Sequence, residues 1–146
     1  MSTPDDCNSN PKSKQKRNRK GVIKVEYQDA INAGEILLKD LEDLEDRIEA
    51  GDPNRIKEGF IRVFSNESVF QYALSDLELT EFENFGRQII DMNTWIDIAY
   101  RSFISGKSVQ PQYLTKGIRA TKNLIKLVKA DEKAWEEIEE TQEGEK

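Results

Sequence analysis

Apolar side chains recur at helical spacing over residues 82–103, and this pattern constrains the fold more than any other feature of the chain. They lie three or four residues apart, on one face of an α-helix at about 100° per residue. The series is Phe82, Phe85, Ile89, Met92, Ile96, Ala99, Tyr100 and Phe103. Thr80 and Glu83 have capping-box spacing, so we predict a helix that runs to about Ser105. Its second half is apolar nearly all round, which predicts a place at the centre of the core.

Similar spacing predicts further helices on either side. One covers residues 27–50 and ends at Gly51-Asp52-Pro53, where Asp52 is the expected N-cap and Pro53 the first residue of the next helix. That second helix is expected to stop at Ser65-Asn66, with a short third helix over residues 68–77. A fifth helix is predicted over residues 113–130, and it can continue into the Glu-rich end.

The composition agrees with an all-α protein. Hydrophobic residues make up 36% and charged residues 34% of the chain, so the apolar content suits small amphipathic helices better than a sheet. We predict an irregular bundle of about five helices. The expected organisation is a flexible basic arm over residues 1–24, a helical domain over 25–130 and an acidic helical extension or tail over 131–146.

The basic arm carries seven basic residues and two acidic ones. Almost no apolar residue occurs before residue 21, so the segment cannot bury enough surface to offset the entropy of ordering. We therefore predict a disordered arm, followed by a short extended piece over residues 21–25. Its candidate phosphate contacts are Lys14, Lys16, Arg17, Arg19 and Lys20.

A second cationic element lies on the fifth predicted helix. Residues 107–130 contain six basic residues and no acidic one. Five of these cations fall within an arc of roughly 140° of the helix, and they span about 20 Å along its axis. We call this set the basic ridge: Lys116, Arg119, Lys122, Lys126 and Lys129. It is a second candidate surface for phosphates.

Two acidic segments offer a different role for these cations. Residues 25–50 carry nine acids against Lys39 and Arg47, and residues 131–146 carry eight acids against two lysines. The helix over residues 27–50 and the basic ridge can therefore neutralise one another, within the fold or between subunits. The acidic end can dock a basic partner, mask the basic ridge, or have no function beyond solvation.

The basic arm is also open to three interpretations: a nuclear localisation signal in a eukaryote, an RNA or DNA contact, or a solubilising tail. It has no aromatic residue, so base stacking is not expected from it. Binding without sequence specificity is the expectation.

The chain is poor material for an enzyme. It has no histidine, and its one cysteine, Cys7, lies in the arm without a base to activate it. Acids over residues 42–49 lie at the three- and four-residue spacings of a metal site. A helix with nine acids produces such spacings by chance. We predict no catalytic residue, no metal site and no cofactor.

The sequence therefore predicts a non-enzymatic helical accessory protein that binds RNA or DNA through phosphate contacts, as a small subunit of a larger nucleoprotein assembly with other protein subunits. The alternative is an interaction adaptor, in which the acidic helix and tail bind a basic partner and the arm is a targeting signal. No stretch approaches the roughly 18 apolar residues of a membrane span. We expect no membrane partner and a cytoplasmic location, or a nuclear one in a eukaryote.

Overall fold

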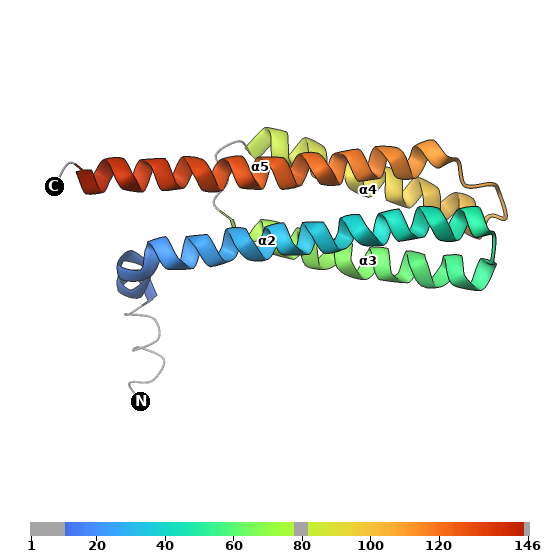
Figure 1. The fold of residues 1–146 in the computed structure, drawn as a ribbon, viewed down its shortest axis with the longest axis horizontal. Helices are drawn as coiled ribbons and strands as arrows, with labels where there is room; N and C mark the ends of the chain where they lie inside the picture. The colour runs from blue at the N-terminus through green and yellow to red at the C-terminus, as the bar shows by residue number, and fades with distance from the viewer. Residues whose placement is uncertain (1–10, 78–81, 145–146) are drawn as a thin grey trace, which may run out of the picture.

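Four long helices form the part of the chain described by the computed structural model, which covers residues 11–77 and 82–144. The helices are α2 (Pro11–Ala50), α3 (Pro53–Ser75), α4 (Phe82–Ile104) and α5 (Pro111–Gly144). They run up and down in turn as a bundle (Figure 1). Helix α2 packs against both α3 and α5, and α4 packs against α5. The predicted all-α class is confirmed.

Local capping explains where the helices meet their turns. Gly51 ends α2 with a φ of 83°, and its amide donates to the Arg47 carbonyl at 3.1 Å. The Asp52 side chain then accepts from the Asn54 amide at 3.1 Å, with Pro53 in the first turn of α3. Both the N-cap and the proline are in the positions predicted from sequence. Gly106, with a φ of 72°, turns the chain after α4.

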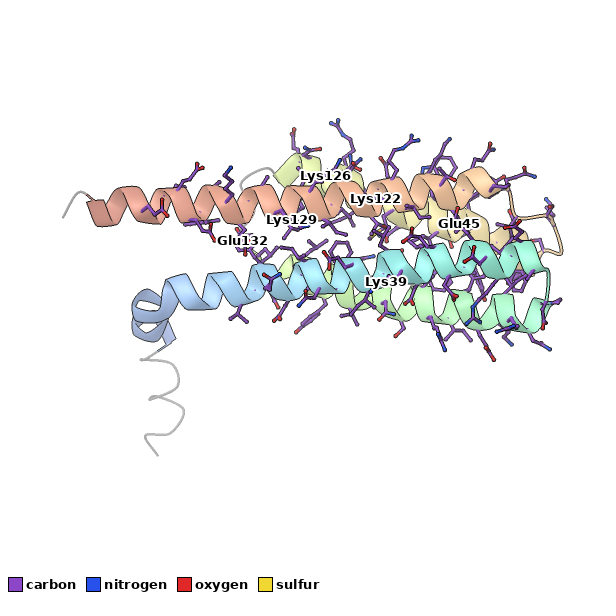
Figure 2. All side chains as sticks on the ribbon, in the orientation of Figure 1. Lys39, Glu45, Lys122, Lys126, Lys129 and Glu132 are labelled. Carbon is purple, nitrogen blue, oxygen red and sulfur yellow. The ribbon has the colours of Figure 1, made fainter. Side chains whose placement is uncertain are left out.

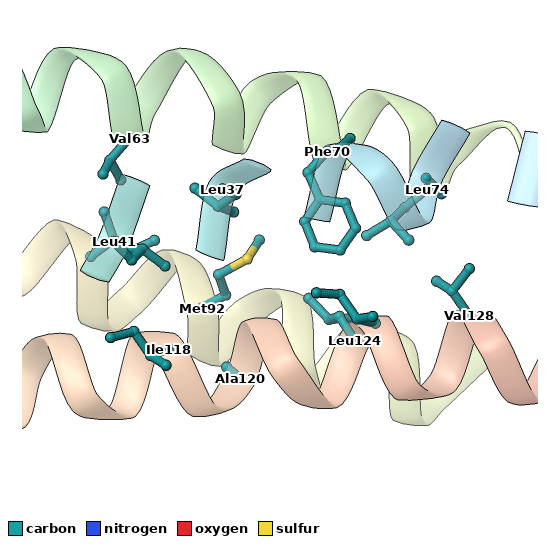
Figure 3. Close-up of a cluster of buried hydrophobic side chains, with 14 of the residues drawn as sticks. Leu37, Leu41, Val63, Phe70, Leu74, Met92, Ile118, Ala120, Leu124 and Val128 are labelled. Atoms are coloured by element: carbon teal, nitrogen blue, oxygen red, sulfur yellow. The ribbon is translucent and has the colours of Figure 1, made fainter. Parts of the chain in front are cut away.

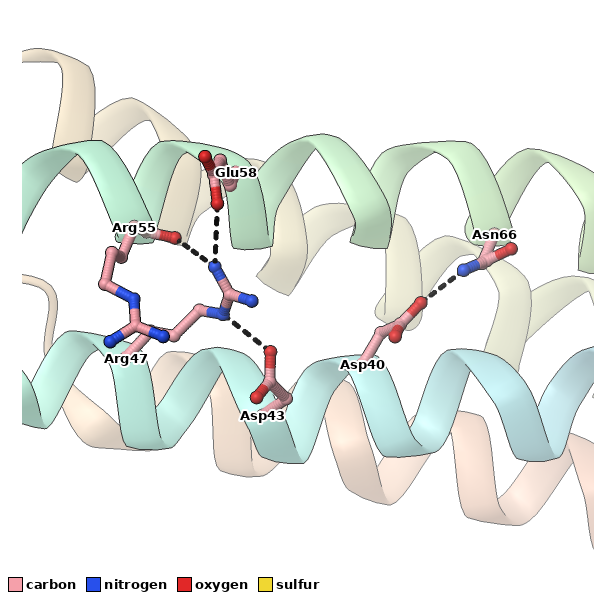
Figure 4. Close-up of polar contacts among 6 residues, drawn as sticks. All are labelled: Asp40, Asp43, Arg47, Arg55, Glu58 and Asn66. Atoms are coloured by element: carbon pink, nitrogen blue, oxygen red, sulfur yellow. Dashed lines mark hydrogen bonds and ion pairs between the residues drawn. The ribbon is translucent and has the colours of Figure 1, made fainter.

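The predicted interruption at Ser65-Asn66 is not seen, because α3 continues through it to Ser75. The Asn66 amide donates to the Asp40 carboxylate of α2, so its polar side chain has a partner outside the helix (Figure 4). Beyond it, Phe70 and Leu74 are buried at helical spacing. The second and third predicted helices are thus one helix, and the described residues contain four helices where the sequence suggested about five.

Helix α2 begins at Pro11, so its first turns take in residues 11–24 of the predicted basic arm. Residues 21–25 are helical here, although the sequence suggested an extended piece. Lysine, arginine and glutamine are good helix formers and can prolong a helix whose later turns are packed. Residues 1–10 of the arm lie outside the described residues.

The core is built from the inward faces of all four helices, as Figure 3 shows for Leu37, Phe70, Met92 and Leu124. These side chains are fully buried. Helix α4 contributes Met92, Ile96 and Ala99 from one face only. Its Ile90 and Ile104 are 64% and 59% exposed, so α4 is not the central helix that its sequence suggested. In a bundle of four, every helix keeps an outward face.

Polar contacts fix how α2 lies against α3 (Figure 4). Arg47 Nε donates to Asp43 at 2.7 Å on the same helix, and its Nη1 donates to the Arg55 carbonyl at 2.8 Å on the next. The Glu58 carboxylate lies 3.5 Å from Nη1. One guanidinium therefore joins the end of α2 to the start of α3.

Gly34 lies at a close contact of α2 with α3 and α5. A Cβ at this position would lie 2.7 Å from Ile125 Cγ1 of α5 and 3.0 Å from the Phe70 ring of α3. Glycine has a low helix propensity, so from sequence alone Gly34 is a weak point of the helix over residues 27–50. In the fold, the absence of a side chain at Gly34 allows α2, α3 and α5 to pack closely together.

Two glycine substitutions test this assignment. Gly86→Ala on α4, where a Cβ meets nothing within 4 Å, should raise the free energy of unfolding by about 1 kcal/mol through helix propensity. Gly34→Ala should lower it by about 1 kcal/mol, because overpacking outweighs the same propensity gain. Urea denaturation measures both. Equal stabilisation by the two substitutions would contradict the proposed close packing at Gly34.

Candidate functional site

The basic ridge lies along the outer side of α5. Lys116, Arg119, Lys122, Lys126 and Lys129 are all exposed, whereas Leu114, Leu124 and Val128 of the same helix are buried in the core. The five cations alternate with these buried positions because the helix repeats every 3.6 residues. The structure therefore brings the five residues together on one surface.

One flank of the ridge faces the acids of α2. Lys129 Nζ lies 3.9 Å from Glu35 Oε1, and both side chains are more than half exposed. Burial raises the pKa of the Glu45 carboxyl, and Glu42 and Asp46 raise it further, whereas Lys122 lowers it. Lys122 thus lies near one acid of α2, Glu45. One of the five cations, Lys129, is partly neutralised by an ion pair within the fold, as the sequence allowed.

This neutralisation is incomplete and weak. An exposed ion pair contributes about 0–1 kcal/mol, since water and salt screen it. Lys126 lies farther from α2, on the outer side of α5, whereas Lys129 and Glu132 lie toward α2 (Figure 2). Lys126, on the outer side of the ridge, is therefore open to an external anion.

The other flank faces α4 and contains a cavity of about 300 Å³ that is widely open to solvent. Lys116 Nζ lies 4.1 Å from the centroid of the Trp95 ring, and the Tyr113 ring is stacked near Trp95 with centroids 6.1 Å apart. Asn123 Nδ2 donates to Gln88 Oε1 at 3.3 Å across the two helices. The cavity is lined by Gln88, Asp91, Trp95, Lys116, Arg119, Ala120 and Asn123.

The sequence did not single out this cavity. Because the second half of its helix is apolar nearly all round, the sequence pattern alone predicts a core position for Trp95. Its half-buried position beside Lys116 depends on how α4 packs on α5. The available signal was the spacing of Tyr113, Lys116 and Arg119, which puts an aromatic residue and two cations within two turns of one helix.

Residues 11–24 of the basic arm belong to α2 and not to α5, the helix of the ridge. Lys14, Lys16, Arg17, Arg19 and Lys20 fall in the first turns of α2. The Tyr27 hydroxyl donates to the Asp131 carboxylate, which sets the antiparallel register of α2 and α5. Residues 11–24 precede this contact and residues 132–144 follow it, so both segments extend in the same direction beyond α3 and α4 (Figure 1). The helix backbone of residues 11–24 thus lies nearer to the acidic end of α5 than to the middle of the ridge.

A buried carboxyl group lies between α3 and α4. Glu67 is only 9% exposed, and its Oε2 has no hydrogen-bond partner among the described residues. Burial raises the pKa of Glu67 to about 7, and the Asp97 carboxylate adds to this effect. The group is protonated in mildly acidic solution, because burial disfavours its charged form.

Metal-binding geometry is not found in the part of the chain that the structure describes, because no three carboxylate, histidine or cysteine side chains there converge on one point. Across the same residues, no helix has the length and apolar content needed to cross a membrane. Comparison with protein-family models, curated proteins and solved structures gives no match.

The pKa of Glu67 predicts a specific pH dependence of stability. Because it is raised from 4.5 in the unfolded chain to about 7 in the fold, the folded state holds more protons across this interval, and the free energy of unfolding should fall as the pH rises through it. Glu67→Gln should remove this fall and stabilise the protein by about 1 kcal/mol at pH 8.

Denaturation with urea at pH 5 and pH 8 measures the effect. Glu42→Gln, at an exposed position on α2, removes the same charge and serves as the control, which should leave the pH dependence unchanged. If Glu67→Gln and Glu42→Gln respond alike to pH, Glu67 is not the group responsible.

Proposed function

We propose that the protein is a non-enzymatic nucleic-acid-binding accessory protein that contacts phosphates through the basic ridge and the basic arm. The observation that carries the proposal is the exposure of all five ridge cations on one face of α5, in a stretch without a single acid. A row of cations that follows a helix for about 20 Å matches the regular negative charge of a nucleic-acid backbone.

The acids of α2 influence where a nucleic-acid strand can lie on the protein. Glu35 and Glu45 approach the ridge from one side, so a phosphate backbone on that side meets like charge. The outer side of α5 and its flank toward α4 have fewer acids, with Asp91 as the carboxylate in the cavity. A bound nucleic-acid strand is therefore expected over the basic ridge from the outer side of α5 and its flank toward α4, away from Glu35 and Glu45.

Such contacts suit an accessory subunit. Phosphate contacts supply affinity but carry no sequence information, and α5 is a rigid element that holds its cations in register. We propose that the protein supports a nucleic acid within a larger assembly whose other subunits supply catalysis or sequence recognition.

The adaptor alternative rests on a different surface. The acids Glu35, Glu42, Asp43, Asp46 and Glu49 are exposed on α2. Ile36 is 52% exposed on the same helix. An acidic surface with an exposed apolar residue suits a basic protein partner. The two functions use different faces of the molecule, so reversing the charges of the ridge distinguishes them.

Charge reversal of the ridge tests the proposed function. The triple variant Lys122→Glu, Lys126→Glu and Lys129→Glu should weaken binding to a DNA oligonucleotide at least about tenfold at low salt. For the unmodified protein, neutralisation of about five phosphates predicts a slope of log K against log salt of about −4.5 for a duplex or about −3.5 for a single strand. Fluorescence anisotropy measures both quantities.

A matched control reverses three exposed cations of α3, Arg55, Lys57 and Arg62. This variant has the same net charge as the ridge variant and should bind several-fold more tightly than it. Equal weakening by the two variants would show that only net charge matters. Unchanged binding after reversal of the ridge would reject the ridge as the contact surface.

A further inference from the structure

The cavity between α4 and α5 combines an aromatic wall with two cations. Trp95 supplies the wall, and Lys116 and Arg119 stand at its rim on the basic ridge. Among the described residues, neither cation forms an ion pair with a carboxylate within 4.0 Å, unlike Lys129 at the other flank. Their charges are therefore available to a ligand.

Lys116 occupies a position that a flat ligand can take over. Its ammonium group lies 4.1 Å from the Trp95 centroid, where the ring attracts it only weakly because water still reaches the lysine. Stacking of a nucleobase on an aromatic ring is generally the stronger interaction. A base that displaces the ammonium group leaves Lys116 free to meet the adjoining phosphate.

The remaining walls offer hydrogen bonds to the edge of a base. Gln88 and Asn123 both have amide donors and acceptors, and the bond between them is long at 3.3 Å. The Asp91 carboxylate also lines the cavity. It repels a phosphate but accepts a hydrogen bond from an amino group of a base. The anion is thus favoured at the rim and the base inside.

We propose that this cavity receives one unpaired nucleobase of a single strand, stacked on Trp95, with the neighbouring phosphates on Lys116 and Arg119. The proposal rests on the proposed function and gives it a substrate class, single-stranded nucleic acid. A duplex cannot use the cavity without unpairing, because its bases are stacked and paired in the helix. The cavity of about 300 Å³ is of a size for one base.

The two tryptophans of the chain make a direct test feasible. Trp135→Phe leaves Trp95 as the single indole, and its fluorescence is followed while the protein is titrated at low salt. The probes are a thymidine 15-mer, the same 15-mer paired with its complement, and inorganic polyphosphate as a polyanion without bases. The single strand should quench Trp95 strongly, and the other two should quench it little.

Binding measurements with the full chain complement the fluorescence. Trp95→Leu should weaken binding of the single strand by about 5- to 100-fold, and Trp95→Phe should weaken it less because a phenyl ring still stacks. Binding of the duplex should stay unchanged in both variants. Tyr72→Leu removes an aromatic ring that is 74% exposed on α3 and should have no effect.

The outcomes separate this inference from the proposed function. Equal quenching by polyphosphate and the single strand would overturn base stacking, since it reports only displacement of Lys116. Suppose that the single strand leaves the Trp95 fluorescence unchanged while reversal of the ridge abolishes binding. This result would overturn the proposal that the cavity binds a base, but it would support the proposed function. If no nucleic acid binds the unmodified protein at low salt, the proposed function fails. Should Trp95→Leu not fold, the fluorescence titration of Trp135→Phe still decides.

Discussion

The missing side chain at Gly34 lets α5 lie close to α2, because Ile125 and Phe70 occupy the space that a Cβ would take. This contact and the Tyr27–Asp131 hydrogen bond fix the antiparallel register of the two helices. The positions of Glu35 beside Lys129 and of Glu45 near Lys122 follow from that register. The distribution of charge around α5 is therefore a consequence of apolar packing.

Packing divides the basic ridge into two chemically different flanks. Toward α2, the cations meet carboxylates, and their attraction for an external anion is reduced. Toward α4, Lys116 and Arg119 line a cavity together with an indole ring, two amides and the Asp91 carboxylate. Among the described residues, neither cation forms an ion pair with a carboxylate within 4.0 Å, so both proposals centre on this side of the molecule.

The sequence predicted what depends on local chemistry. The turn at Gly51-Asp52-Pro53, the all-α class and the helical phase of α5 follow from capping residues and apolar spacing, and the structure has all three. The polar pair Ser65-Asn66 predicts a break in the helix, but α3 is continuous there. The Asn66 side chain donates to Asp40 on another helix, and this contact is not evident from the sequence. The sequence shows that the five ridge cations share one helix face, but it does not show which residues of other helices lie beside them. That Glu35 lies on one flank and Trp95 on the other depends on how three helices pack.

The central claim is that a polyanion docks on the outer and α4-facing sides of α5 and not on α2. Chemical-shift mapping of the ¹⁵N-labelled protein with a thymidine oligonucleotide at low salt tests it most directly. The largest changes should fall in residues 116–126 of α5 and residues 88–95 of α4, with residues 35–46 of α2 little affected. Changes concentrated on α2 or α3, or no changes at saturating oligonucleotide, would contradict the account.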